Sequence, residues 1–353
     1  MKVMYNFSIK RPNTLLWIFS ILFILNLDAF SQGVGKSNNP AYKPYFDSLK
    51  KMDYPYALPI LGKQAYKRGY DISYAYGISG VYFTQTQEIS IESTSIGING
   101  SEQVDLSNVI DFGPTIATTN AYTVRPDIWL LPFLNLYGIL GGGTTETRVN
   151  LLAPVGLETT QRFEARSFGL GATLAGAVGP VWIAWDNNYN FVDVDVIVEP
   201  IPAFNSSIRF GHTLRNPTYP QKSLAVWVGV FYQKLSNDTR GSIGVTEIFP
   251  GFGSGNFIGT LRDWSETLPP AQRLVVNQII NELENVSNNI DSDGTIDYTL
   301  EKRVTAPFNI ILGSQYQFNK RWILRTELGV FGKRSQFMLN LNYRIPGFRK
   351  TTK

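Results

Sequence analysis

The two-residue alternation of apolar and polar side chains in the C-terminal third constrains this chain most strictly. Over residues 336–344 every second residue is apolar, and those between are polar except Met338. The same alternation recurs over 308–318 and 321–331, with only short connections between the three segments. Alternation over about ten residues, repeated in adjacent segments, is typical of strands that cross a membrane as part of a barrel.

Weaker alternation upstream brings the expected total to about ten strands. Twelve are expected if 81–98 or 243–257 contains two strands, and both totals are even, as in single-chain bacterial barrels. A soluble β-sandwich also alternates, but it has shorter strands and more outward charge than these segments carry. We therefore predict an all-β fold, a transmembrane antiparallel β-barrel of 10–12 strands with one helical insertion. The upstream segments are Val81–Ile96, Tyr122–Leu131, Phe133–Val149, Phe163–Val178, Val181–Phe191, Phe204–Arg215 and Leu224–Lys234.

The first 31 residues resemble a secretory signal peptide. A basic start precedes an apolar run of about 13 residues and the cleavage pattern Ala29-Phe30-Ser31. The run is shorter than a membrane-spanning helix requires, although a retained anchor is the alternative. We expect a bacterial outer-membrane location and both chain ends in the periplasm, with Asn319-Lys320 and 215–223 as periplasmic turns. The expected divisions are a signal peptide (1–31), a periplasmic lead (32–70), a barrel (71–345) with an insertion (235–306), and a tail (346–353).

Composition argues against several kinds of function. The chain has no cysteine and one histidine, which excludes thiolate chemistry and clusters of histidine ligands. Its net charge of +4 is dispersed, so we expect no nucleic-acid partner. By strand parity His212 shares the lipid-facing side with Phe210 and Leu214, and no nucleophile motif is present. We predict that the protein is not an enzyme.

Charged residues gather on the faces that the alternation assigns to the lumen. Such groups either pair across strands or line an aqueous path. About ten strands leave little interior space, so a wide pore is not expected. Structural pairing and a narrow or gated path for small, anionic solutes both remain open. The lumen-lining candidates are Arg166, Arg209, Arg215, Arg321, Arg325, Glu327 and Arg344.

The insertion contains the one convincing helix of the mature chain, Leu268–Asn288. Thr267 is expected to cap it, a proline suits its first turn, and its apolar residues form one stripe. The stripe must be buried, either by a helix that closes over its own barrel or by a protein partner at 268–288.

The residues after this helix resemble the start of a calcium loop. Oxygen-bearing side chains alternate before a glycine, but the closing glutamate is missing, because Leu300 occupies its position. An acidic turn between helix and strand is the alternative. No other cofactor is expected. The candidate calcium ligands are Asn289, Asp291, Asp293 and Asp297.

Two segments, Asp127–Gly138 and Pro307–Trp322, resemble poorly characterised outer-membrane barrel proteins of Bacteroidota-like bacteria. The resemblance implies fold and location, and its motifs mark strands and turns rather than chemistry. Our leading functional hypothesis is passive or gated passage of small solutes, or lipid-related transport, with outer-membrane lipid around the barrel. The alternative is a non-conducting barrel that displays its insertion for adhesion or partner binding.

Overall fold

The computed structural model describes residues 40–153, 157–195, 197, 199–235, 238–248, 256–288 and 294–350. The predicted signal peptide lies outside these residues, as does the start of the predicted lead.

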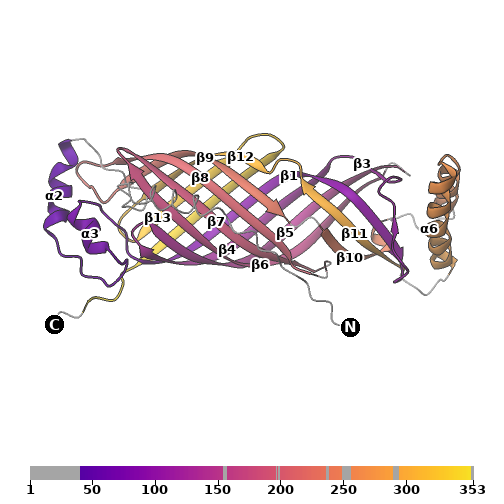
Figure 1. The fold of residues 1–353 in the computed structure, drawn as a ribbon, viewed down its shortest axis with the longest axis horizontal. Helices are drawn as coiled ribbons and strands as arrows, with labels where there is room; N and C mark the ends of the chain where they lie inside the picture. The colour runs from indigo at the N-terminus through magenta and orange to yellow at the C-terminus, as the bar shows by residue number, and fades with distance from the viewer. Residues whose placement is uncertain are drawn as a thin grey trace, which may run out of the picture.

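Ten strands form a closed antiparallel barrel. The first of them, β1, pairs with β4 on one side and with β14 on the other, which closes the ring (Figure 1). This confirms the predicted fold at the lower of the two strand counts. The ring consists of β1 (Tyr76–Ile98), β4 (Thr115–Leu131), β5 (Leu134–Ala153), β6 (Leu157–Val178), β7 (Val181–Val194), β8 (Ile201–Arg215), β9 (Ser223–Leu235), β12 (Phe308–Gln317), β13 (Trp322–Gly329) and β14 (Arg334–Ile345).

As far as the described residues extend, neither stretch that we considered for an additional pair of ring strands supplies one. β1 is a single 23-residue strand with a register shift between Ile91 and Ser93. The other stretch, 243–257, leaves the sheet after Gly244 and forms a short helix, α4 (Val245–Ile248). Four further strands pair with parts of the ring or with each other: β2 (Val104–Asp105), β3 (Asp111–Phe112), β10 (Asp238–Gly244) and β11 (Thr295–Val304).

An apolar belt surrounds the barrel. On β12 the outward side chains from Phe308 to Leu312 are apolar and exposed, and their counterparts on β9 match them. Aromatic pairs flank this belt, with Tyr316–Phe318 and Trp322–Tyr343 near one mouth. A closed barrel with an apolar belt between aromatic girdles is the architecture of a bacterial outer-membrane protein, and the chain belongs in that membrane. The second girdle includes Phe204, Tyr232, Phe308, Tyr82, Tyr122 and Phe337.

The wall continues well beyond the second girdle. β5 and β6 have 20 and 22 residues, about twice what a transmembrane strand requires. Above the girdle their outer faces become charged, as in the Arg148–Glu158 pair, at 3.7 Å between Nε and Oε1. β11 joins this extension by pairing with β1 from Ile89 to Ile98, and its Arg303 forms an outward ion pair with Glu92. We call this extension the upper wall.

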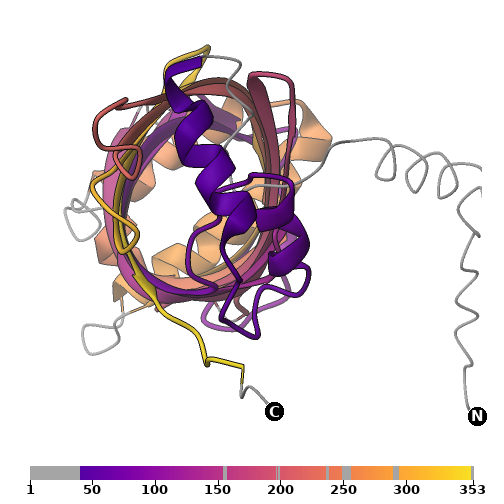
Figure 2. The ribbon, with the colours of Figure 1, turned by 90° about the vertical axis from the view of Figure 1, so that its left-hand side faces the viewer.

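Helices lie at both ends of the barrel. The lead forms η1 (Pro40–Tyr42), α2 (Lys43–Lys51) and α3 (Gly62–Lys67), and α2 and α3 cross one opening (Figure 2). We call this opening the lead mouth. The insertion forms α5 (Phe257–Glu266) and α6 (Pro270–Asn288), and α6 lies across the opposite end, the cap mouth (Figure 1). Among the described residues, no helix combines the length and apolar character needed to cross a membrane.

Two predictions about helices were wrong. Leu268–Asn288 is not the only helix of the mature chain, because α2, α3 and α5 also form. Thr267 is the C-cap residue of α5, where its hydroxyl donates to the carbonyl of Trp264 at 2.7 Å, and α6 begins without it at Pro270. The tight α5–α6 connection uses the residue that we assigned to a cap.

Candidate functional site

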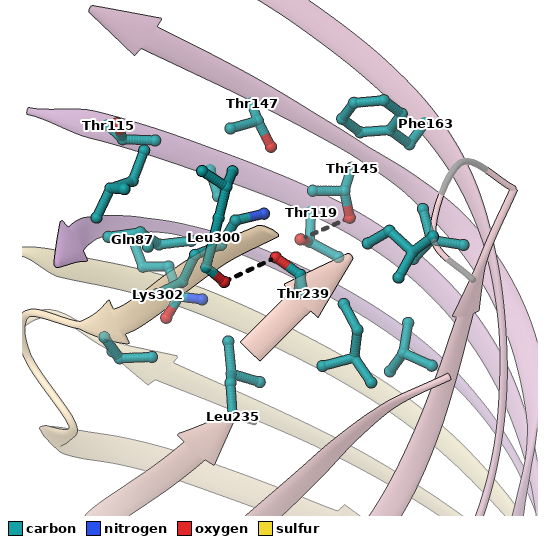
Figure 3. Close-up of a pocket in the computed structure, with 18 of the residues that line it drawn as sticks. Gln87, Thr115, Thr119, Thr145, Thr147, Phe163, Leu235, Thr239, Leu300 and Lys302 are labelled. Carbon is teal, nitrogen blue, oxygen red and sulfur yellow. Dashed lines mark hydrogen bonds between the residues drawn. The ribbon is translucent and has the colours of Figure 1, made fainter. Parts of the chain in front are cut away.

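The upper half of the barrel encloses a chamber of about 590 Å³. It extends from the helices at the cap mouth to a layer of charged side chains deeper in the lumen. Figure 3 shows threonines of β4 and β5, among them Thr119 and Thr145, facing Thr239 and Lys302 across this space. Most of the lining is apolar, especially toward the cap mouth: Ile91, Ile96, Ile98, Leu106, Leu261, Trp264, Val276, Ile279 and Leu283.

The cap helix α6 closes the chamber through its apolar stripe. Ile279, Ile280 and Leu283 are buried against residues of the upper wall and of α5, including Ile98 and Leu261. Burial of one such side chain stabilises the folded state by about 1.5–3 kcal/mol. The stripe that we predicted either to close the barrel or to bind a partner is therefore occupied within this chain.

A charged layer around Glu327 forms the floor of the chamber. The Glu327 carboxylate, only 4% exposed, accepts from Arg209 Nε at 2.7 Å and from Arg325 Nη2 at 3.1 Å. The Trp227 indole also donates to it at 3.1 Å, and the Arg325 guanidinium lies 4.9 Å from the centre of the Trp227 ring. Three strands, β8, β9 and β13, thus converge on one carboxylate.

A second ion pair lies below this floor. Arg344 of β14 donates through Nη2 to Asp127 of β4 at 2.7 Å, and Asn135 donates to the same carboxylate at 2.8 Å. Between these two strands lies Gly77 of β1, where a Cβ atom would clash with the Arg344 guanidinium. The pair therefore requires glycine at this position, and its side chains fill the lumen near the lead mouth.

The lead is held on its mouth by Asp71. This buried carboxylate lies 3.6 Å from Nη1 of Arg215, the last residue of β8, and 3.5 Å from Nζ of Lys320 in the β12–β13 turn. Tyr45 of α2 donates to it at 2.7 Å. Burial and the neighbouring carboxylate raise the pKa of Tyr45, so its phenol stays neutral and keeps donating. Asp71 is the main electrostatic link between the lead and the barrel.

Replacing Asp71 with asparagine is expected to release the lead. The change leaves Arg215 buried without its counter-ion, a loss of about 3 kcal/mol or more for a buried pair. We expect chymotrypsin to cleave the lead at least about tenfold faster, because cleavage follows the population of the open form. The measurement is limited proteolysis of the folded, detergent-solubilised protein.

Asp47→Asn is the matched control for this prediction. Asp47 also joins two lysines, Lys43 and Lys50, each at 2.8 Å, but all three side chains are solvent-accessible on α2. Exposed pairs of this kind contribute little to stability. Equal cleavage of both variants would contradict the role assigned to Asp71.

The structure assembles five of the seven predicted lumen residues inside the barrel. Arg209, Arg325 and Glu327 form the floor, while Arg215 and Arg344 lie buried closer to the lead mouth.

The structure places the other two predicted lumen residues, Arg166 and Arg321, outside the lumen. Arg166 is exposed on the outer face of β6 beside Phe168, because the upper wall lies above the belt and its outer face meets water. Arg321 lies exposed in the β12–β13 turn, where it donates to the outward Tyr343 hydroxyl at 3.0 Å.

Of the four candidate calcium ligands, only Asp297 lies among the described residues. Asn289, Asp291 and Asp293 lie outside the described residues, and Asp297 accepts a hydrogen bond from the Gly100 backbone at 2.7 Å. Among the described residues, no three acidic or histidine side chains are grouped closely enough to hold a metal ion. Calcium binding stays an untested hypothesis.

The single histidine lies on the outer wall. His212 is exposed at the end of β8, and its Nδ1 lies 2.8 Å from the carbonyl oxygen of Pro180. This matches the predicted outward position.

The sequence prediction missed several lumen cations, among them Arg334 and Lys302. Arg334, 2% exposed, donates to the amide oxygens of Gln87 and Gln233 at 2.7 and 2.8 Å. Lys302 lines the upper part of the chamber. A signal for Lys302 was present, because 295–304 alternates like a strand and places this lysine on the side of Ile296 and Leu300.

No family model and no curated protein matches this chain. Among solved structures, the outer membrane protein OprG from Pseudomonas aeruginosa is similar at 8% identity and a TM-score of 0.36, over 77% of this chain and 98% of that one. The translocator domain of the autotransporter NalP from Neisseria meningitidis has 10% identity and a TM-score of 0.33 (87% and 100% covered). The Ralstonia pickettii toluene transporter TbuX has 10% identity and a TM-score of 0.28, over 91% of this chain and 100% of that one.

Proposed function

We propose that this barrel provides gated passage for small solutes across the outer membrane, with the chamber as a binding station on the route. The observation that carries the proposal is the chamber itself, a largely apolar space of about 590 Å³ inside a membrane barrel. This volume is within the usual range of small-molecule sites. A barrel that served only as an anchor has no need of such a space, since small barrels are otherwise filled by their own side chains.

The two ends of the route differ in how they are held. Apolar packing attaches α6 at the cap mouth, whereas ionic contacts to Asp71 attach the lead at the other mouth. Between them lies the Glu327 layer, which forms the floor of the chamber. Passage then consists of entry at the cap mouth, residence in the chamber, and exit past the charged layer when the lead undocks.

The alternative proposal is a non-conducting barrel that displays its insertion. Burial of Ile279, Ile280 and Leu283 in the cap removes the surface that we had assigned to a partner. We therefore favour passage, and the experiment below separates the two.

Planar-bilayer recordings test the proposal. Asp71→Asn, which frees the lead, is expected to raise the open probability at least about tenfold over the unmodified protein. Asp47→Asn is the control and should behave like the unmodified protein. If the Asp71→Asn lead is free by proteolysis but no unitary currents occur, the barrel does not conduct and the display alternative gains support.

A further inference from the structure

Lys302 is a cation inside the chamber that lacks a carboxylate partner among the described residues. It lies on β11 at the register position of Ile91, in the upper wall and therefore above the lipid belt. Figure 3 shows it directed into the chamber on the same side as Gln87. Arg209 and Arg344, by contrast, each have a carboxylate at hydrogen-bond distance. Burial lowers the pKa of Lys302 to about 8.

The chamber that contains Lys302 has further buried groups without partners. Thr94, Thr115 and Gln85 are among the lining residues, and the hydroxyls of the two threonines and the amide oxygen of Gln85 are almost completely buried and have no hydrogen-bond partner. Buried polar atoms are normally paired, and each exception calls for an explanation. A hydroxyl donates to an anion as readily as it accepts, so Thr94 and Thr115 are suited to an oxygen-bearing head group. The lining therefore leaves both charge and hydrogen bonds unsatisfied.

The chamber toward the cap mouth offers a different environment. Its lining there is formed by aliphatic side chains of β1 and of α5 and α6, with the Trp264 ring among them. An apolar body removes this surface from water, whereas a small hydrated ion does not.

We propose that the chamber binds an amphipathic organic anion, with its charged head at Lys302 and its apolar body under α5 and α6. The compounds in question carry a carboxylate or sulfonate on an aromatic or short aliphatic body. The proposal rests on the chamber that the proposed function uses as its route, but binding requires no passage.

The test compares 2-naphthoate with its neutral analogue 2-naphthamide by calorimetric titration of the full mature protein in one detergent. In Lys302→Met, naphthoate affinity is expected to fall about tenfold or more, as for loss of one charged hydrogen bond, while naphthamide affinity stays within about twofold. Lys234→Met removes an exposed lysine from the outer face of β9 and should change neither affinity.

A pH series gives a second readout. As pH rises from about 7 to about 9.5, Lys302 loses its proton, so naphthoate affinity should fall in the unmodified protein and stay flat in Lys302→Met. Burial raises the pKa of Tyr298, which keeps it neutral over this interval. The charged groups on the neighbouring strands divide into two sets. Those at outward positions are Glu301 and Arg303 of β11, Glu88 and Glu92 of β1, and Arg240 of β10. Those directed inward are Arg334, Arg125, Asp186 and the Glu327 layer.

If the affinities for naphthoate and naphthamide fell equally in Lys302→Met, the proposal would be overturned, because the substitution would then have changed the chamber as a whole. Unchanged naphthoate binding would overturn it as well. Naphthoate binding that depends on Lys302 in a barrel that never conducts would refute the proposed passage and leave the anion site standing.

Discussion

Replacing Glu327 with glutamine is expected to lower the unfolding free energy by about 3 kcal/mol or more. The substitution preserves the shape of the side chain but removes the negative charge that Arg209 and Arg325 share. Two guanidinium groups are then left in the lumen without a counter-ion, and a buried uncompensated charge is among the costliest defects in a folded protein. Urea unfolding of the barrel refolded into lipid vesicles measures the change.

Glu284→Gln is the control for the Glu327 prediction. Glu284 also forms an ion pair with an arginine, Arg262, but on the exposed surface of α5 and α6. A surface pair contributes about 0–1 kcal/mol, so this variant should remain close to the unmodified protein. A loss below about 1 kcal/mol in Glu327→Gln would contradict the view that the layer is held by its single carboxylate.

Replacing Leu312 with arginine is expected to lower the free energy of unfolding by about 2–4 kcal/mol, the range for a cation at the midplane of a transmembrane barrel. Leu312 is 48% exposed on the outer face of β12, midway between the girdle residues Phe308 and Tyr316. Its exposure is therefore to lipid. The measurement is again unfolding from lipid vesicles, together with the fraction of protein that assembles.

Leu152→Arg is the matched variant outside the belt. Leu152 is 52% exposed next to the last residue of β5, in the upper wall where outward residues meet water. Its replacement should cost less than about 0.5 kcal/mol, as for an ordinary surface change. Similar losses at both positions would refute our placement of the upper edge of the belt.

Alternation was sufficient to predict the ring because the outer face of a barrel wall meets lipid, whereas its inner face meets the side chains that fill the lumen. All ten predicted segments fall on ring strands, including weakly patterned ones such as Phe133–Val149. The same rule misled us where the environment changes along one strand. Arg166 has the parity of the outward Phe168, yet we assigned it to the inward face, because the pattern does not reveal where lipid ends and water begins.

The parts of the site that sequence reasoning missed depend on contacts between distant segments. Lys302 belongs to a stretch that we treated as a loop, and it becomes a lumen residue only because β11 pairs with the upper part of β1. The role of Asp71 likewise depends on Arg215 and Lys320, which are more than 100 residues away in the chain. Local periodicity carries no information about such pairings.

The contact between the lead and the C-terminal tail sets an order of events in assembly. Backbone hydrogen bonds join Ala57 to Phe348 at 3.0 Å and Lys350 to Pro55 at 2.8 Å, so the lead docks on residues that follow β14. Those residues reach their place only when β14 has paired with β1 and the seam is shut. Completion of the barrel therefore precedes full docking of the lead, and a protected lead marks a finished molecule.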